Sequence, residues 1–300
     1  MSTSAPTETS PEAAVQESSQ PLLEVRGLTK RFTSHGSSGK KITRAVDDVS
    51  FDIMPGETFG LVGESGCGKS TTGRSLLRLI EPDSGTVRYE GRDLVTMPRR
   101  ELHSTRRQIQ MVFQDPFSSL NPRRRIGAIL EEALQIQFHL RMSDRRERVL
   151  KILDKVGFSE EYYYRFPHEM SGGQRQRIGV ARALIVDPKL IICDEPVSAL
   201  DVSIQSQILN MLDDLQAELG LSYLFISHDL SVVRHISDRI AVMKDGQIVE
   251  QGPTDAIFSN PQHAYTQQLL NAIPASHPSI ARSRYAAASA SAPIIPQRKA

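Results

Sequence analysis

The sequence contains few cysteines, no tryptophan and no long apolar run. Its two cysteines, Cys67 and Cys193, are too few for the disulfide framework of a small secreted protein. No stretch reaches the roughly 18 consecutive apolar residues that a membrane-spanning helix requires. Residues 1–20 lack basic residues and an apolar run, so no secretory signal is expected. These absences predict a protein that is made and kept in the cytoplasm.

An excess of one charge is also absent, because 36 basic residues balance 35 acidic residues and the net charge is +1. A partner that attracts strongly basic proteins, such as nucleic acid, is therefore not indicated. Residues 92–151 are a local exception, with twelve arginines and one lysine against seven acidic residues. This segment is either an ordinary solvated face or a surface that meets membrane partners and anionic lipid headgroups.

Low-complexity composition marks both ends of the chain. Residues 1–20 are rich in Ser, Thr, Pro, Ala and Glu, and residues 276–300 are rich in Ala, Ser and Pro. Neither segment has enough large apolar side chains to form a core, so both are expected to be disordered tails. The intervening chain is long enough for one large domain or two small ones.

Apolar patterns between the tails predict an α/β protein. Apolar or alternating runs predict strands at 22–25, 49–53, 58–62, 85–91, 109–113, 190–193, 223–226, 240–243 and 247–249. Helical periodicity predicts helices at 70–80 and 204–219 and a helical run over 126–164. Small polar residues predict a loop at 34–40, and Asp245-Gly246 predicts a turn.

The motif with the clearest chemistry is Gly63-Glu64-Ser65-Gly66-Cys67-Gly68-Lys69-Ser70-Thr71, which matches the phosphate-binding pattern G-x-x-x-x-G-K-[ST]. A predicted strand precedes it and a predicted helix follows it, as this motif requires. The glycines allow backbone N–H groups to turn toward phosphates, and the helix N-terminus adds partial positive charge. Lys69 is expected to reach the β- and γ-phosphates, and Ser70 to offer its hydroxyl to Mg²⁺. The alternative is a Gly-rich turn that matches by chance.

Two carboxylates follow the apolar strand at 190–193. Ligands bind at the carboxyl ends of strands in open α/β sheets. Asp194 is therefore a candidate for holding Mg²⁺ through a water molecule, and Glu195 for orienting or deprotonating an attacking water. The alternative is an ordinary strand end followed by acidic residues.

A second candidate phosphate-binding loop is Ser171-Gly172-Gly173-Gln174, at the start of an apolar helix. A serine and two glycines at a helix N-terminus form an anion-binding nest. One nucleotide does not readily use two such loops of the same molecule. Two molecules that face each other would each supply one loop to a shared nucleotide.

These motifs resemble the ATP-binding subunit of ABC transporters, over roughly residues 22–275. The resemblance is carried by the signature-like loop Met170-Ser171-Gly172-Gly173-Gln174 (with Met in place of the usual Leu), the Walker B pair Asp194-Glu195, the D-loop Ser198-Ala199-Leu200-Asp201, the switch histidine His228 and the Q-loop residue Gln114. All of them occur in the order typical of the family.

The resemblance implies a P-loop NTPase (ABC ATPase) fold, with an antiparallel β subdomain and an inserted helical subdomain. The ATP-binding domain is expected at 21–259, and the helical subdomain at about 118–172. The resemblance further implies that two such subunits bind two ATP molecules with Mg²⁺ between them, head to tail. Each ATP would lie on one subunit's Lys69 loop and contact the other subunit's signature loop.

The resemblance also assigns roles to single residues. It implies that Glu195 is the general base and that His228 contacts the γ-phosphate. Gln114 is expected to sense Mg²⁺ and the attacking water and to link the site to a membrane partner. Phe32 is the best candidate for stacking on adenine, although the family more often has Tyr. The two cysteines are expected to be packing residues without a redox role.

The segment Asn260–Pro274 resembles the C-terminal motif of ATPase subunits in the oligopeptide/dipeptide/nickel importer group, which typically contains His-Pro-Tyr-Thr. Ala264 replaces that proline. The alternative is an amphipathic terminal helix, with Tyr265, Leu269 and Ile273 on one face. No cysteine follows Cys193, so the iron–sulfur cluster of some relatives is not expected.

The predicted function is therefore ATP-driven import of solute, in particular peptides, through separate transmembrane permease subunits. The resemblance implies a second ATP-binding subunit (identical or a paralogue), an indirect extracytoplasmic solute-binding partner and a peripheral location on the cytoplasmic face of the membrane. The competing hypothesis is a soluble ABC ATPase that acts on nucleic acid or ribosomes. Chromosome and repair members need long coiled coils, whereas the segment between Gln114 and Ser171 is short and lacks heptads. A P-loop kinase would not need the Ser171 loop.

Overall fold

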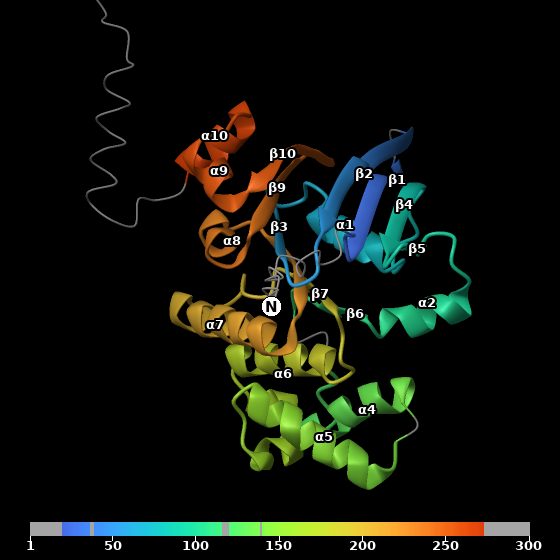
Figure 1. The fold of residues 1–300 in the computed structure, drawn as a ribbon, viewed down its shortest axis with the longest axis vertical. Helices are drawn as coiled ribbons and strands as arrows, with labels where there is room; N and C mark the ends of the chain where they lie inside the picture. Colours follow the sequence, from blue (N-terminus) through green and yellow to red (C-terminus); the bar gives the residue numbers. More distant parts are fainter. Residues whose placement is uncertain (1–19, 37–38, 116–119, 139, 273–300) are drawn as a thin grey trace, which may run out of the picture.

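The computed structural model describes residues 20–36, 39–115, 120–138 and 140–272 (Figure 1). The strands are β1 (Leu23–Gly36), β2 (Gly39–Ile53), β3 (Thr58–Val62), β4 (Ser84–Tyr89), β5 (Arg92–Asp93), β6 (Ile109–Val112), β7 (Leu190–Asp194), β8 (Ser222–Ser227), β9 (Arg239–Lys244) and β10 (Gln247–Pro253). The α-helices are α1 (Lys69–Leu76), α2 (Arg99–Arg106), α4 (Ile126–Gln137), α5 (Met142–Lys155), α6 (Gly172–Leu184), α7 (Val202–Leu219), α8 (Leu230–Ile236), α9 (Thr254–Ser259) and α10 (Ala264–Asn271). Two 3₁₀-helices are η1 (Glu160–Tyr164) and η2 (Pro167–Glu169). The predicted tails, apart from Gln20, lie outside the described residues.

The strands form two sheets. The larger has the order β10-β9-β3-β8-β7-β6, and its strands are parallel except for the antiparallel β9–β10 pair. The smaller has the order β2-β1-β4-β5 and is antiparallel throughout. The predicted combination of a P-loop core with an antiparallel β subdomain is therefore confirmed. Strand β3, which leads into the phosphate-binding motif, lies between β9 and β8, and its residues are all buried.

Alternate side chains of the parallel strands belong to two different hydrophobic cores. Ile191 and Cys193 of β7 pack in the core that includes α4–α7, whereas Leu190 and Ile192 pack in the core shared with the smaller sheet. Residues 190–193 are buried on both faces of the sheet, which favours a continuous apolar run over polar alternation. This explains why the strand at 190–193 has no polar alternation.

The helices between Leu120 and Ser171 form a separate layer (Figure 1). Helices α4 and α5 gather at the end of the molecule opposite α9 and α10. No strand occurs among the described residues of this segment, as the helical periodicity predicted. Across the described chain, none of the helices has the length and apolar content required to cross a bilayer.

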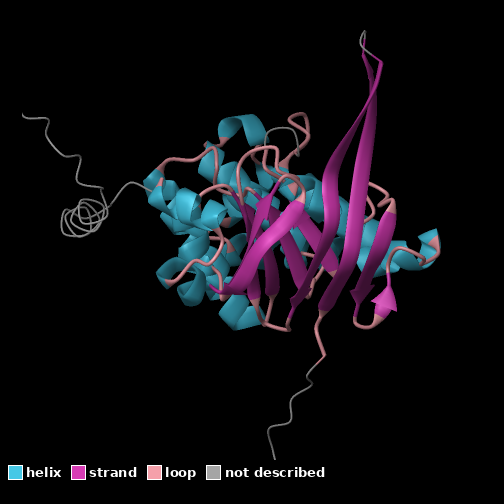
Figure 2. Ribbon diagram, turned by 90° about the horizontal axis from the view of Figure 1, so that it is seen from above, coloured by secondary structure: helices cyan, strands magenta, loops and turns pink. Residues whose placement is uncertain are grey.

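The loop predicted at 34–40 is largely wrong. Strand β1 continues to Gly36 and β2 begins at Gly39, so the two form a long antiparallel ribbon that projects beyond the other strands (Figure 2). Residues 37–38 lie outside the described part. The outer ribbon has few large apolar side chains, and its strand structure comes from backbone pairing such as that between Thr33 and Ile42. Composition alone could not indicate that pairing.

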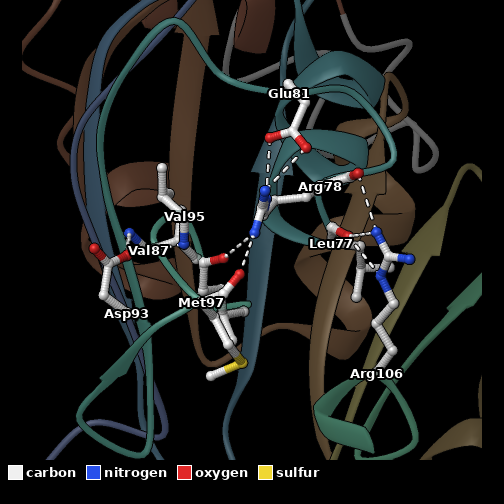
Figure 3. Close-up of polar contacts among 9 residues, drawn as sticks. Leu77, Arg78, Glu81, Val87, Asp93, Val95, Met97 and Arg106 are labelled. Atoms are coloured by element: carbon white, nitrogen blue, oxygen red, sulfur yellow. Dashed lines mark hydrogen bonds and ion pairs between the residues drawn. The ribbon is translucent and has the colours of Figure 1, made fainter. Parts of the chain in front are cut away.

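Arg106 of α2 fixes the end of α1, the helix that follows the phosphate-binding motif (Figure 3). Its Nε and Nη2 atoms donate to the Leu77 carbonyl at 2.9 and 2.7 Å, and Nη2 also donates to the Arg78 carbonyl at 3.0 Å. Arg78 in turn donates to the Met97 carbonyl at 2.7 Å and pairs with Glu81. The Arg106 bonds satisfy carbonyl groups at the C-terminal end of α1, which lack intrahelical partners. The Arg78 bond ties this end to the segment before α2. Helix α1 ends at Leu76 and is therefore shorter than the helix predicted over 70–80.

Candidate nucleotide-binding site

The phosphate-binding motif forms a tight loop between β3 and α1. Gly66 and Gly68 have φ angles of 84° and 112°, a region that glycine adopts without steric cost. A Cβ atom at Gly68 would lie 1.9 Å from the Ala45 carbonyl oxygen, whereas one at Gly66 would meet no atom within 4 Å. Gly68 therefore allows the loop to pack against β2, and Gly66 leaves space on the open side of the loop.

Lys69 is the buried cation of this loop, with 3% of its surface exposed. Its ammonium group donates to the carbonyl oxygens of Gly63 and Glu64, at 2.7 and 2.8 Å. Helix α1 begins at Lys69, and Thr72 donates the first backbone bond, to Gly68. The N–H groups of Ser70 and Thr71 precede the first intrahelical bond and remain available to an anion.

Asp194 lies behind the loop at the end of β7 and is fully buried. Its carboxylate accepts a bond from the Ser70 hydroxyl at 2.6 Å and pairs with Arg74 at 3.5 Å. Burial raises the pKa of Asp194, although the Ser70 bond and the Arg74 charge oppose this shift. The pair predicted to hold Mg²⁺, Ser70 and Asp194, is thus in direct contact.

The Glu195 carboxylate, just beyond β7, contacts side chains that follow the two neighbouring strands, β6 and β8. The Gln114 amide, just beyond β6, donates to the Glu195 carboxylate at 2.9 Å. His228 Nδ1, just beyond β8, lies 3.2 Å from the same oxygen. The strand order β8-β7-β6 explains this meeting, because parallel strands present their carboxyl ends at one edge. Side chains 81 residues apart in the sequence are therefore in contact.

A cavity of about 240 Å³ opens at this edge. Its lining comes from the phosphate-binding loop, the end of β7, the segment after β6, and β2. The lining residues are Ala45, Ser65, Gly66, Gly68, Lys69, Ser70, Thr71, Gln114 and Glu195. The cavity thus joins the predicted phosphate loop to two of the three predicted catalytic residues.

The lining residues fit the phosphates of a nucleotide with Mg²⁺. Lys69 and the start of α1 supply positive charge, and Gly66 leaves room for a ligand beside the backbone. Ser70 and Gln114, with Asp194 buried behind Ser70, supply oxygen atoms, which Mg²⁺ prefers. No cluster of three or more His, Cys, Asp or Glu side chains suited to a metal occurs in the described ranges. Mg²⁺ is commonly bound by one or two carboxylates together with substrate phosphates, and Ser70, Asp194 and Gln114 suit such shared coordination.

The Ser171 loop lies at the start of α6 and does not line this cavity. The Ser171 hydroxyl accepts from the Gln174 N–H at 3.3 Å, and the Gln174 side chain accepts from the Ser171 N–H at 3.0 Å. This capping box fixes the loop as a helix start. A Cβ atom at Gly173 would lie 2.4 Å from the Ile204 side chain, so glycine permits α6 to approach α7.

Phe32 is also outside the lining of the cavity. It lies on β1 opposite Thr43, and 43% of its surface is exposed. The Lys30 ammonium lies 5.6 Å from the centre of its ring. Phe32 thus has an exposed ring that is open to stacking, but the contact with adenine stays a prediction.

Sequence patterns missed three residues at this site. Ala45 touches the loop through its carbonyl, Arg74 pairs with Asp194, and Tyr265 accepts a bond from the Glu64 N–H at 3.3 Å. The spacing of Arg74 from Ser70, one helical turn, is a signal that could have placed both on one face of α1. The other two contacts join distant segments, and no local pattern indicates them.

Comparison with known families agrees with the motifs. Residues 46–198 match the ABC transporter family, and residues 249–295 match the C-terminal region of oligopeptide/dipeptide transporters. The chain is 53% identical over 263 residues to the glutathione import ATP-binding protein GsiA of Escherichia coli strain K12. The aligned region covers 87% of this chain and 42% of that protein. It is 52% identical over 268 residues to GsiA of Salmonella choleraesuis strain SC-B67, covering 88% and 43%. The chain therefore spans about two fifths of the length of these relatives.

Solved structures of ATP-binding cassettes have the same fold. The dimeric, post-hydrolysis structure of a cassette bound to ADP and Pi has a TM-score of 0.70 at 30% identity, and covers 78% of this chain and 99% of that chain. The cbiO1 protein of Clostridium perfringens, part of the ABC transporter complex cbiONQ, has a TM-score of 0.72 at 27% identity, with 88% and 99% coverage.

Proposed function

The chain belongs to the ABC transporter family, and from this membership we propose that it is the ATP-hydrolysing subunit of a peptide importer. Support for import comes from the match of residues 249–295 to the C-terminal region of oligopeptide/dipeptide transporters. Relatives more than 50% identical are named for the import of glutathione, which is itself a small peptide. Solute would cross the membrane through separate permease subunits.

The nucleotide in this proposal is ATP with Mg²⁺. Lys69 and the backbone of residues 63–71 hold the phosphates, and Phe32 stacks on adenine. Ser70, Asp194 and Gln114 hold the metal, directly or through water. When bound, Mg²⁺ supplies a Lewis acid that neutralises charge developing on the phosphate oxygens.

Glu195 acts as the general base that orients and deprotonates the attacking water. The observation that carries this assignment is the convergence of Gln114 and His228 on one Glu195 oxygen, at 2.9 and 3.2 Å, beside the cavity. Two such partners hold the carboxylate in one orientation and leave its second oxygen to accept a proton. His228, whose side chain is half-exposed, contacts the γ-phosphate in this proposal.

The site is completed by a second ATP-binding subunit, identical or a paralogue. The loop Ser171, Gly172, Gly173 and Gln174 contacts the nucleotide held by the partner, which explains why it lies outside this chain's own cavity. In this arrangement the subunit is peripheral, on the cytoplasmic face of the membrane, and an extracytoplasmic solute-binding protein acts on it only indirectly. No nucleic-acid partner is proposed.

The alternative remains a soluble ABC ATPase that acts on nucleic acid or ribosomes. Membrane fractionation separates the two functions. Import predicts membrane association that resists salt and requires permease proteins, whereas co-sedimentation with ribosomes would contradict import.

Substitution of the proposed base tests the mechanism. Glu195→Gln keeps the size and the bond from Gln114 but cannot accept a proton, so we expect ATP binding to persist and hydrolysis to fall at least about 100-fold. ATP should then trap a closed dimer. Phosphate release and bound nucleotide are measured on the same sample. Glu90→Gln, which changes an exposed carboxylate paired with Lys189, serves as the control. Unchanged turnover in Glu195→Gln would refute the assignment of the base.

A further inference from the structure

We propose that Tyr265 of the C-terminal helix α10 is a positioning residue for ATP, because it fixes the backbone of the phosphate-binding loop. This inference rests on the proposed nucleotide site and gives the C-terminal segment a role in it. It concerns a contact between residues 201 positions apart in the sequence.

The contact involves Glu64, a loop residue whose N–H and carbonyl are both hydrogen-bonded. The Glu64 N–H donates to the Tyr265 hydroxyl at 3.3 Å, and the Glu64 carbonyl accepts from Lys69 at 2.8 Å. The Glu64 carbonyl also accepts from the Cys67 N–H at 3.3 Å. The Glu64 N–H shares its peptide group with the Gly63 carbonyl, to which Lys69 donates at 2.7 Å. The Tyr265 bond therefore sets the direction of a peptide group that Lys69 contacts.

Other segments from the C-terminal part of the sequence also contact the phosphate-binding loop. The Gly246 N–H, in the β9–β10 turn, donates to the Cys67 carbonyl at 2.9 Å. A Cβ atom at Gly63 would lie 2.1 Å from the Met243 carbonyl oxygen, so the loop backbone packs directly on β9. Tyr265 extends this support to Glu64, which neither of those contacts reaches.

Tyr265 is itself held firmly enough to position another group. It is 4% exposed, and the Lys244 ammonium lies 4.7 Å from the centre of its ring. Its own N–H donates to His263 Nδ1 at 3.1 Å, which caps α10. The Glu250 carboxylate of β10 accepts from the N–H groups of Gln262 and His263, at 2.7 and 3.1 Å. The segment before α10 is therefore tied to the larger sheet.

The consequence is a preorganised loop. A loop that is ordered before the ligand arrives loses less conformational entropy on binding. Removal of the hydroxyl should therefore weaken ATP binding and leave the chemistry at Glu195 intact. A net hydrogen bond of ordinary strength corresponds to an affinity change of about twofold to tenfold.

The test uses Tyr265→Phe in the full chain, since this change removes the hydroxyl and keeps the buried ring. Hydrogen exchange of the Glu64 amide in nucleotide-free protein should become at least about threefold faster. The dissociation constant for ATP with Mg²⁺, measured by calorimetry, should rise about twofold to tenfold. In the hydrolysing assembly, KM should rise in parallel and kcat should change by less than about twofold. The control is Tyr163→Phe, which removes a hydroxyl that donates to Glu131 in the helical layer.

The inference is overturned by a wild-type exchange rate at the Glu64 amide, or by wild-type ATP affinity despite faster exchange. Equal effects of Tyr163→Phe and Tyr265→Phe on affinity also overturn it, because the effect would then not be specific to the loop. Failure of the proposed function gives a different pattern. In that case the wild-type chain binds no ATP, while the exchange experiment still reports on the Tyr265 contact.

Discussion

Glu195 has a left-handed backbone conformation, with a φ angle of 49°. Residues with a Cβ atom rarely adopt this region, at a cost of about 1–2 kcal/mol. Its N–H group donates to the Ile226 carbonyl at 2.9 Å, which holds the turn after β7 against β8. The same turn brings the carboxylate to Gln114 and His228. The backbone cost thus coincides with the position at which the proposed base is needed.

At its neighbour, Asp194, the effect of charge on stability can be tested. Burial raises the pKa of this carboxyl above the ordinary value of 3.8. Because the folded protein binds the proton more tightly than the unfolded chain, stability falls as the pH rises above the unfolded pKa, and the loss is complete above the folded pKa. Asp194→Asn keeps an acceptor for Ser70, so we expect the Tm of nucleotide-free protein to rise by about 2–4 °C at pH 8. The gain should shrink as the pH falls through the folded pKa.

Thermal unfolding between pH 4 and pH 8 measures this effect. Asp144→Asn is a suitable control, because Arg141 and Ser143 lower the pKa of the exposed Asp144 and no increase in Tm is expected there. A decrease in Tm for Asp194→Asn at pH 8, without pH dependence, would contradict the argument.

Individual site residues could be predicted where they belong to a local motif. Lys69 and Ser70 follow glycines at a fixed spacing, and Asp194 and Glu195 end an apolar strand. Tyr265 has no comparable signal, because its partner Glu64 is a variable position of the motif. Its role follows only from the order of β3, β9 and β10 in the folded sheet.

At the scale of elements, Arg106 connects two helices that share no sequence motif. Its guanidinium caps the C-terminal end of α1 through the Leu77 and Arg78 carbonyls. Arg106→Ala leaves these partly buried carbonyls without a donor, so we expect a loss of about 1–3 kcal/mol in the free energy of unfolding.

Chemical denaturation measures this loss, and the exposed Arg100 of the same helix provides the matched control Arg100→Ala. ATP affinity should weaken as well, because α1 carries the N–H groups that face the cavity. A stability loss equal to that of Arg100→Ala would mean that the bonds to α1 contribute nothing.

Elements were predictable where burial dictates their pattern. Strands β7 and β8 have buried side chains on both faces, and their apolar runs are unambiguous. The outer part of the β1–β2 ribbon lacks such a pattern, and its small polar residues predict a loop instead of the observed strands. The basic segment 92–151 was also ambiguous. Ion pairs with acidic residues outside this segment, such as Arg146–Glu160 and Arg148–Asp187, balance part of its excess charge within the fold.

At the scale of the whole molecule, the Ser171 loop contributes nothing to the nucleotide site of its own chain. In the proposed assembly it contacts the nucleotide held by the second chain. Ser171→Arg places a bulky cation on this loop, outside the cavity around Lys69. We expect the affinity of a single chain for ATP to be unchanged within about twofold. Hydrolysis by the assembled pair should fall at least about 10-fold, because the loop would no longer fit the partner's nucleotide.

Calorimetry and phosphate release together check this prediction. Ser104→Arg, on the exposed face of α2, controls for the added charge. Equal hydrolysis by Ser171→Arg and wild-type protein would argue against a site completed by a second chain.

The position of β3 in the larger sheet has a consequence for synthesis on the ribosome. Its two neighbours, β8 and β9, begin at residues 222 and 239, long after β3 and the phosphate-binding motif have been translated. Until then, the nascent chain contains the complete motif and the apolar strand β3 before it, but neither of the two strands with which β3 pairs. Apolar strands that are exposed in this way are prone to aggregation until their partner strands arrive. Nucleotide binding is therefore expected to begin only once β9 has emerged.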